Sequence, residues 1–258
     1  MKKWGTAFKI VAVAAVFLFL SACAGNKGPS PEEERAEASK DLGEAHMAEG
    51  NYTKALRELL KAEKMNPDDP FVHNDLGLTY LAKKTPEKAV KHFKKAIELN
   101  EEYSAAVNNL GTAYVAMEKW DKAVECFEKV SQDLLYMTPH YPLSNLGYVY
   151  YELGEYHKAE KYYMEALEMK RDYPRALYGL GRVCLARGDI KEAIRKLERA
   201  VDKAPEAAAF YMDLAKAYKK NHEYHKAVDT YKKAASIAEG TALGDKAEAE
   251  AEYIMEMY

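Results

Sequence analysis

The sequence predicts an all-α protein built as a solenoid of repeated helix pairs. One observation is a residue pattern that recurs six times between residues 36 and 241, mostly at intervals of 34 residues. A second is the spacing of these residues, which recur at intervals of three, four and seven and therefore share one helical face. A third is the closing segment, residues 242–258, which is rich in alanine and glutamate. Repeats that pack only on their neighbours form a solenoid, whose last apolar face needs an atypical cap.

Residues 1–22 have the composition of a secretory signal peptide. Three lysines precede an apolar run from Ile10 to Leu20, which is shorter than the roughly 20 residues of a membrane-spanning helix. The segment ends in Leu20-Ser21-Ala22-Cys23, which resembles the bacterial lipobox. The resemblance implies that residues 1–22 are removed and that Cys23 is acylated, with the lipid bilayer as its partner. Ala24 stands where an aspartate would resemble an inner-membrane retention signal, so the expected location is the periplasmic leaflet of the outer membrane.

Residues 23–35 are predicted to form a flexible tether that follows the lipidated cysteine. Gly25, Gly28 and Pro29 lie here, before any apolar period begins. The glutamates at the end of this segment also suit the first turn of a helix, because carboxylates interact favourably with its positive dipole end, and Ser30 is a candidate N-cap.

The six repeats are expected at residues 36–69, 70–103, 104–139, 140–173, 174–207 and 208–241. Their seventh residue is always leucine, and their eighth is glycine except in the sixth repeat, which has Ala215. The twentieth residue is always alanine, and the twenty-fourth is leucine or an aromatic residue. Small residues let two helices approach closely, and large ones fill the space between repeats. These positions resemble the tetratricopeptide repeat (TPR), which implies a right-handed α-solenoid of helix-turn-helix units.

The closing segment, residues 242–258, is predicted to be a capping helix. Leu243, Ala247, Tyr253 and Ile254 would lie against the sixth repeat while the glutamates face solvent. A C-terminal helix that binds a partner is the alternative interpretation.

The sequence points away from catalysis and from nucleic acid. Its net charge of −3 provides no broad basic field for DNA or RNA. It carries no phosphate-binding loop, zinc-protease, dithiol or serine-hydrolase motif, so we expect no catalytic residue, cofactor, metal site or small-molecule substrate. His222 and His225 fall short of the ligands that a metal needs and are expected in a solvated turn. Cys126 and Cys184 lie two repeats apart, which predicts two free, buried thiols.

TPR arrays have an inner groove, and the resemblance implies that positions two, five, six, nine and twelve of each repeat line it. In repeats two to five, these positions hold Asn74, Asn108, Asn109, Thr112, Ser144, Asn145, Tyr148, Tyr151, Tyr178 and Arg182. Asparagine can both donate to and accept from a peptide backbone, and tyrosine supplies contact area at little entropic cost. We therefore predict a peptide-binding groove. The alternative is that the asparagines serve packing alone.

The connection between the third and fourth repeats is two residues longer than the others. The extra residues fall within residues 132–139, where Pro139 prevents a simple continuation of the preceding helix. Leu134, Leu135, Tyr136 and Met137 either fold back onto the two repeats, which we expect, or remain exposed as a partner-binding loop.

This connection also carries a family resemblance. Its pattern D-x-x-Y-x-T-P before NLG, together with the lipobox and the six repeats, resembles the type IV pilus pilotins, the PilF/PilW/Tgl-like TPR lipoproteins of the outer membrane. The resemblance implies an adaptor that binds subunits of the pilus secretin and promotes their outer-membrane localisation and multimerisation. Another TPR scaffold lipoprotein, serving the β-barrel assembly machine or peptidoglycan hydrolases, is the alternative. A wall-remodelling hydrolase and a structural spacer are two further interpretations.

Overall fold

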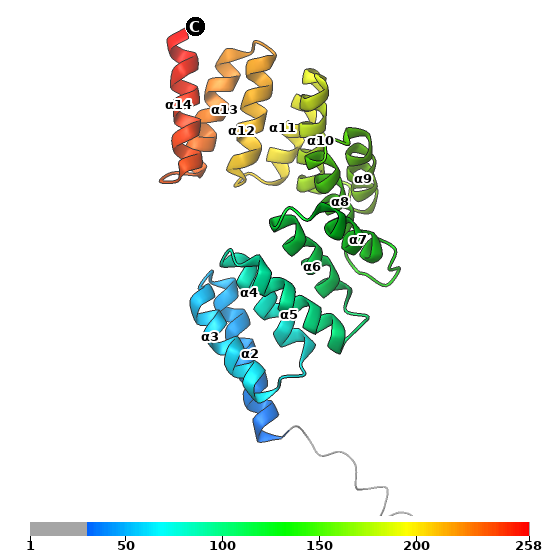
Figure 1. The fold of residues 1–258 in the computed structure, drawn as a ribbon. Helices are drawn as coiled ribbons and strands as arrows, with labels where there is room; N and C mark the ends of the chain where they lie inside the picture. Colours follow the sequence, from blue (N-terminus) through cyan, green and yellow to red (C-terminus); the bar gives the residue numbers. More distant parts are fainter. Residues whose placement is uncertain (1–29, 258) are drawn as a thin grey trace, which may run out of the picture. The chain divides into compact units, whose positions relative to one another are not determined.

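The computed structural model describes residues 30–257, and within that range the chain forms 13 helices and no strands (Figure 1). The predicted all-α fold class is confirmed. The helices are α2 (Pro31–Ala48), α3 (Tyr52–Met65), α4 (Pro70–Ala82), α5 (Pro86–Leu99), α6 (Ser104–Ala116), α7 (Trp120–Ser131), α8 (His140–Glu152), α9 (Tyr156–Met169), α10 (Pro174–Arg187), α11 (Ile190–Lys203), α12 (Ala208–Lys220), α13 (Tyr224–Ile237) and α14 (Ala242–Met257).

The predicted signal peptide, the lipidation site Cys23 and most of the predicted tether lie outside the described residues. Between residues 30 and 257, no helix combines the length and the apolar composition that crossing a membrane requires.

The chain consists of two compact units, Met1–Val72 and His73–Tyr258. In the first unit, α2 packs against α3, and a Cβ at Gly43 would lie 2.7 Å from Cγ of Leu59. The small eighth residue therefore makes room for the large twenty-fourth residue of the same repeat. Leu42 is an exception to the expected packing because it is exposed; α2 is the first helix that the structure describes, so within residues 30–257 no preceding repeat packs on it.

Helix α2 begins earlier than the first repeat was expected to begin. Ser30 caps it, since the Ser30 hydroxyl accepts from the backbone N–H of Glu33 and the Glu33 carboxylate accepts from the N–H of Ser30. This capping box and a proline in the first turn start the helix at Pro31. The predicted tether boundary at residue 35 is therefore wrong, because residues 31–35 are helical.

In the second unit, the helices from α5 to α14 pack on their neighbours along the chain. The pairs α6–α7, α8–α9, α10–α11 and α12–α13 pack within repeats, and α7–α8, α9–α10 and α11–α12 pack between them. Helices α6, α8, α10 and α12 begin at the residues that open repeats three to six in the sequence.

The buried ring of Tyr163 faces two glycines. A Cβ at Gly147, in the same repeat, would lie 2.7 Å from Cδ1 of Tyr163, and a Cβ at Gly179, in the next repeat, 2.1 Å from its Cζ. Two glycines from different helices therefore cradle one ring.

The turn inside each repeat of the second unit contains one residue with positive φ. Two of these residues are Gly154 and Gly188, and the equivalent position holds Lys84, Glu118 and His222 in the other repeats. The left-handed conformation costs a non-glycine residue roughly 1 kcal/mol. His222 lies in an exposed turn, as expected, and its ring bonds to the hydroxyl of Tyr224, whereas His225 is exposed but lies in the first turn of α13.

Helix α14 packs against α13 and α12 at the end of the second unit, where Figure 1 shows these three helices in red and orange. Ala247 and Ile254 are buried and Leu243 is partly buried, but Tyr253 is 53% exposed. The predicted packing of Tyr253 is therefore wrong. It lies one residue before Ile254, which places it off the buried face, and the ammonium of Lys219 lies 5.0 Å from its ring centre.

The expectation that the connection between α7 and α8 folds back is also wrong, since Leu134, Leu135 and Met137 are almost fully exposed and Tyr136 is partly exposed. The loop is closed on itself by Asp133, whose carboxylate accepts from the N–H of Leu135 and from the Ser104 hydroxyl. The short side chain of Asp133 thus fixes the backbone conformation of the loop, and in this conformation the apolar side chains lie in solvent.

Cys126 and Cys184 are free thiols, as predicted, and both are partly buried. Burial raises the pKa of the Cys126 thiol to about 11, which keeps it in the unreactive protonated form at neutral pH.

The stability of the second unit is expected to fall as the pH rises above 10. Burial raises the pKa of Tyr163 and Tyr231 above their ordinary value of 10.0. In the unfolded chain these hydroxyls ionise near pH 10, whereas in the folded chain they stay neutral to a higher pH. The stabilisation from burying the neutral tyrosines is therefore complete below pH 10 and is lost as the pH rises toward the folded-state pKa. The free energy of unfolding then falls by about 1.4 kcal/mol per pH unit for each tyrosine that ionises only in the unfolded chain.

Urea unfolding between pH 8 and 11 measures this slope. Tyr231→Phe should flatten the profile, and an unchanged slope would contradict the assignment.

Candidate functional site

A solvent-open pocket of about 440 Å³ lies among α8, α10, α12 and α14 of the second unit, and we call it the groove pocket. It brings together four residues of the predicted groove, Tyr148, Tyr151, Tyr178 and Arg182. The remaining lining residues are Glu152, Leu185, Ala209, Met212, Asp213, Lys216, Leu243 and Lys246.

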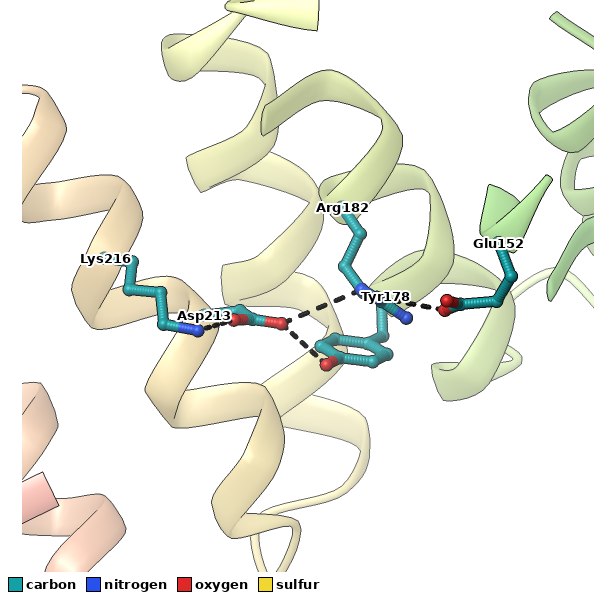
Figure 2. Close-up of polar contacts among 5 residues, drawn as sticks. All are labelled: Glu152, Tyr178, Arg182, Asp213 and Lys216. Atoms are coloured by element: carbon teal, nitrogen blue, oxygen red, sulfur yellow. Dashed lines mark hydrogen bonds and ion pairs between the residues drawn. The ribbon is translucent and has the colours of Figure 1, made fainter. Parts of the chain in front are cut away.

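Helical spacing places the polar side chains on one side of the pocket. Tyr178 and Arg182 lie four residues apart on α10, and Asp213 and Lys216 lie three apart on α12, so each pair shares a helical face. Figure 2 shows Glu152 at the end of α8 reaching Arg182 from the side opposite Asp213. Three helices therefore contribute to one polar network.

Arg182 lies at the centre of this network. Its guanidinium carbon is 4.0 Å from the centre of the Tyr151 ring, and its Nη2 is 3.3 Å from Oε1 of Glu152. Burial alone would lower the pKa of Arg182, but Tyr151, Tyr178 and Glu152 outweigh burial and raise it. The cation–π contact contributes about 0.5–1 kcal/mol, and the partly exposed ion pair contributes no more than about 1 kcal/mol. Arg182 is therefore a fixed positive charge.

Asp213 joins α10 to α12. The Tyr178 hydroxyl donates to Oδ2 of Asp213 at 2.6 Å, and Nζ of Lys216 donates to Oδ1 at 2.6 Å (Figure 2). The Tyr178 ring also stacks on Phe210, with ring centres 4.1 Å apart. Burial, followed by the negative charge of Asp213, raises the pKa of Tyr178 well above its ordinary value. Tyr178 therefore remains a hydrogen-bond donor at neutral pH.

Sequence reasoning did not assign Asp213 or Glu152 to the groove. Asp213 is the sixth residue of the sixth repeat, which is one of the groove positions of the TPR, but the list of predicted groove residues stopped at the fifth repeat. Extending that list by one repeat would have found it. Glu152 is the thirteenth residue of its repeat, which is not among the groove positions two, five, six, nine and twelve.

The pocket is suited to binding a polypeptide segment. Leu185, Met212 and Leu243 supply apolar surface, and the exposed Tyr148 ring supplies an aromatic contact. Lys246 is exposed and adds a positive charge at the α14 side. Apolar and aromatic surface with a few charged groups is typical of sites that bind a peptide carrying an apolar side chain and an acidic group.

The other predicted groove residues lie on α4, α6 and α8, where the four asparagines form hydrogen bonds between repeats. Asn109 donates to Asn74 at 2.9 Å, and Asn145 donates to Asn108 at 3.2 Å. These amides thus link neighbouring repeats, and Asn74 is buried. Ser144 is buried as well, while the exposed Thr112 donates to the backbone carbonyl of Asn108. None of these six residues lines the groove pocket, and their binding of a peptide stays a prediction.

The chain is similar to TPR proteins in sequence and fold. Tetratricopeptide repeat models match residues 72–103, 102–172, 141–206 and 185–251, and a TPR repeat model matches residues 43–84. No curated protein matches the chain.

Solved structures share the fold at low identity. Pseudomonas aeruginosa PilF is 19% identical, with a TM-score of 0.69, and the match covers 86% of this chain and 100% of PilF. PilW, described as a widely conserved type IV pilus biogenesis factor, is 18% identical, with a TM-score of 0.72 and coverage of 82% and 97%. TTC0263, a thermophilic TPR protein of Thermus thermophilus, is 25% identical, with a TM-score of 0.61 and coverage of 70% and 98%.

The repeat models leave few residues of the helical region unmatched. Together they run from residue 43 to residue 251, which includes helix pairs from both units. The chain therefore belongs to the tetratricopeptide repeat family.

Proposed function

We propose that the chain is a lipid-anchored TPR adaptor of the pilotin type. It binds subunits of the type IV pilus secretin and promotes their localisation and multimerisation in the outer membrane, without catalysing a reaction. The groove pocket carries this proposal, because the positive charge of Arg182, the tyrosines and the apolar surface together suit a polypeptide segment.

The network around Arg182 gives the proposed site a stable shape before a client arrives. Asp213 holds Tyr178 and Lys216, while Glu152 and Tyr151 hold Arg182. A preorganised site loses little conformational entropy on binding, so more of the contact energy contributes to affinity. Lipidation at Cys23 would confine the adaptor to the target membrane and raise the effective concentration of a bound client there.

Two further observations support the choice of client. The fold is shared with PilF and PilW over more than four fifths of this chain, and PilW is described as a type IV pilus biogenesis factor. The sequence adds the lipobox-like residues that end at Cys23 and the D-x-x-Y-x-T-P pattern of residues 133–139. At such low identity, the structural likeness supports the fold alone. The two sequence features are what connects this fold to the pilus.

Deleting the gene is expected to abolish the secretin multimers that resist heat and detergent, while secretin monomers remain detectable. The reason is that unescorted subunits would not gather in the outer membrane. Immunoblots of unheated and heated membrane fractions measure both species. Complementation with the wild-type gene should restore the multimers, and normal multimers in the deletion strain would contradict the proposal.

The rival adaptor roles predict different neighbours of the groove pocket. A photo-cross-linker that replaces the exposed Tyr148 should form products with the secretin under our proposal. Products with β-barrel assembly subunits or peptidoglycan hydrolases, together with intact secretin multimers after deletion, would favour the other scaffold roles.

A further inference from the structure

A loop of the second unit holds three large apolar side chains in solvent. It is the connection between α7 and α8, in which Leu134, Leu135 and Met137 are 99%, 89% and 92% exposed. Single exposed apolar residues are common, but a contiguous group of them is typical of an interaction site. The loop shares no lining residue with the groove pocket.

The backbone of this loop is held in one shape. The N–H of Asp133 donates to the carbonyl of Val130 at 3.1 Å, and the N–H of Tyr136 donates to the carbonyl of Asp133 at 3.2 Å. The Asp133 carboxylate also accepts from Ser104 on α6 and from the N–H of Leu135. The exposed side chains are therefore presented on an ordered turn tied to α6, which lowers the entropic cost of binding a partner.

Beside the loop lies a hollow of about 530 Å³ with an apolar interior. Ala105 and Val107 of α6 and Val130 of α7 line it, together with Leu135 and Met137 of the loop. One large apolar side chain of a partner would find contacts here with both the helices and the loop.

The rim of this hollow is acidic. Glu101 and Glu102 line it and are exposed, and neither forms an ion pair with any residue in the described part of the chain. Asp133 adds a third carboxylate, whose pKa is lowered first by the hydrogen bond from Ser104 and then by the N–H of Leu135. Lys129 is the basic residue of the lining. The rim thus favours a positively charged neighbour and repels a bilayer that carries anionic lipids.

We propose that this loop and its hollow are a second docking surface, for a protein segment that places an apolar side chain next to a lysine or arginine. The apolar side chain would enter between α6, α7 and the loop, and the basic group would pair with Glu101 or Glu102. This surface does not depend on which client the groove pocket binds.

Photo-cross-linking in cells that express the full-length chain tests the proposal. Met137 is replaced by p-benzoylphenylalanine, and the cross-linked peptides are sequenced by mass spectrometry. We expect a protein segment with an apolar residue at the cross-link and a lysine or arginine nearby. The same probe at the exposed Lys191 of α11 is the control. Products with lipid only, or a yield no higher than at Lys191, would overturn the proposal.

Charge reversal tests the role of the acidic rim. The double variant E101K/E102K should lower the cross-linking yield at position 137 about tenfold. The double variant E239K/E256K changes the net charge equally at two exposed acids outside the loop and should leave the yield unchanged. Equal cross-linking yields in the two variants would contradict the proposed pairing of a partner's lysine or arginine with Glu101 or Glu102.

The exposed leucines provide a variant that does not disturb folding. L134S/L135S should lower the yield at position 137 while the melting temperature stays unchanged, because neither side chain contributes to a buried core. An unchanged yield would show that the loop is not the contact surface.

Discussion

Replacing Gly179 by alanine is expected to lower the free energy of unfolding of the second unit by about 2 kcal/mol. In an exposed helix the same change would raise it by about 1 kcal/mol, because glycine is the poorer helix former. At Gly179 the change in the free energy of unfolding has the opposite sign, because the new Cβ would lie 2.1 Å from Cζ of Tyr163. This ring is buried and already faces Gly147. Urea unfolding of the full chain, followed by circular dichroism, measures the change.

A second substitution should rescue this variant. In the fifth repeat the equivalent residue is Leu197, and the sixth residue of the repeat that follows is Asp213, which carries a Cβ. The double variant Gly179→Ala/Tyr163→Leu recreates that combination and removes the ring atoms Cζ, Cε1 and Cε2 that the new Cβ would meet, so it should recover part of the lost stability. Ala186→Gly, on an exposed part of the same helix, measures the intrinsic helix preference. If Gly179→Ala stabilises the unit, the proposed cradle around Tyr163 is wrong.

Replacing Asp213 by alanine is expected to cost about 2 kcal/mol of stability and to weaken client binding in the groove pocket. The Tyr178 hydroxyl and the Lys216 ammonium would lose their shared acceptor, and the half-buried hydroxyl would have no equivalent partner in the network. Urea unfolding measures the stability, and cross-linking from Tyr148 measures the binding. Asp229→Ala on the exposed face of α13 is the matched control and should change neither quantity.

A double-mutant cycle separates the hydrogen bond from the rest of the network. Tyr178→Phe should cost about 1 kcal/mol in the wild-type chain and much less when Asp213 is already alanine. Additive effects of the two substitutions would show that the 2.6 Å contact contributes little to stability.

Much of the helical framework could be read from the sequence because the packing is local. The glycine at position eight and the large residue at position twenty-four lie sixteen residues apart in one repeat, and they meet in the structure at Gly147 and Tyr163. The helix starts of repeats three to six follow the same period. The start of α2 does not follow the repeat period, because a capping box at Ser30 and Glu33 begins this helix at Pro31.

The candidate site was only partly predictable. The position rule of the repeat placed Tyr148, Tyr151, Tyr178 and Arg182 in one groove, and these four residues meet in one pocket. The same rule could not tell that the asparagines bond to one another across repeats, because that depends on the separation of helices.

The sequence by itself determined the fold class, the number of repeats and the packing face of most helices, because neighbours in a solenoid are neighbours along the chain and repeat the same residue types. Only the tertiary structure decided that Asp213 holds Tyr178 across 35 positions and that Leu134, Leu135 and Met137 stay in solvent. The physical reason is that neither feature has a period. The first depends on the register and rotamers of two helices, and the second on how the carboxylate of Asp133 closes an irregular turn.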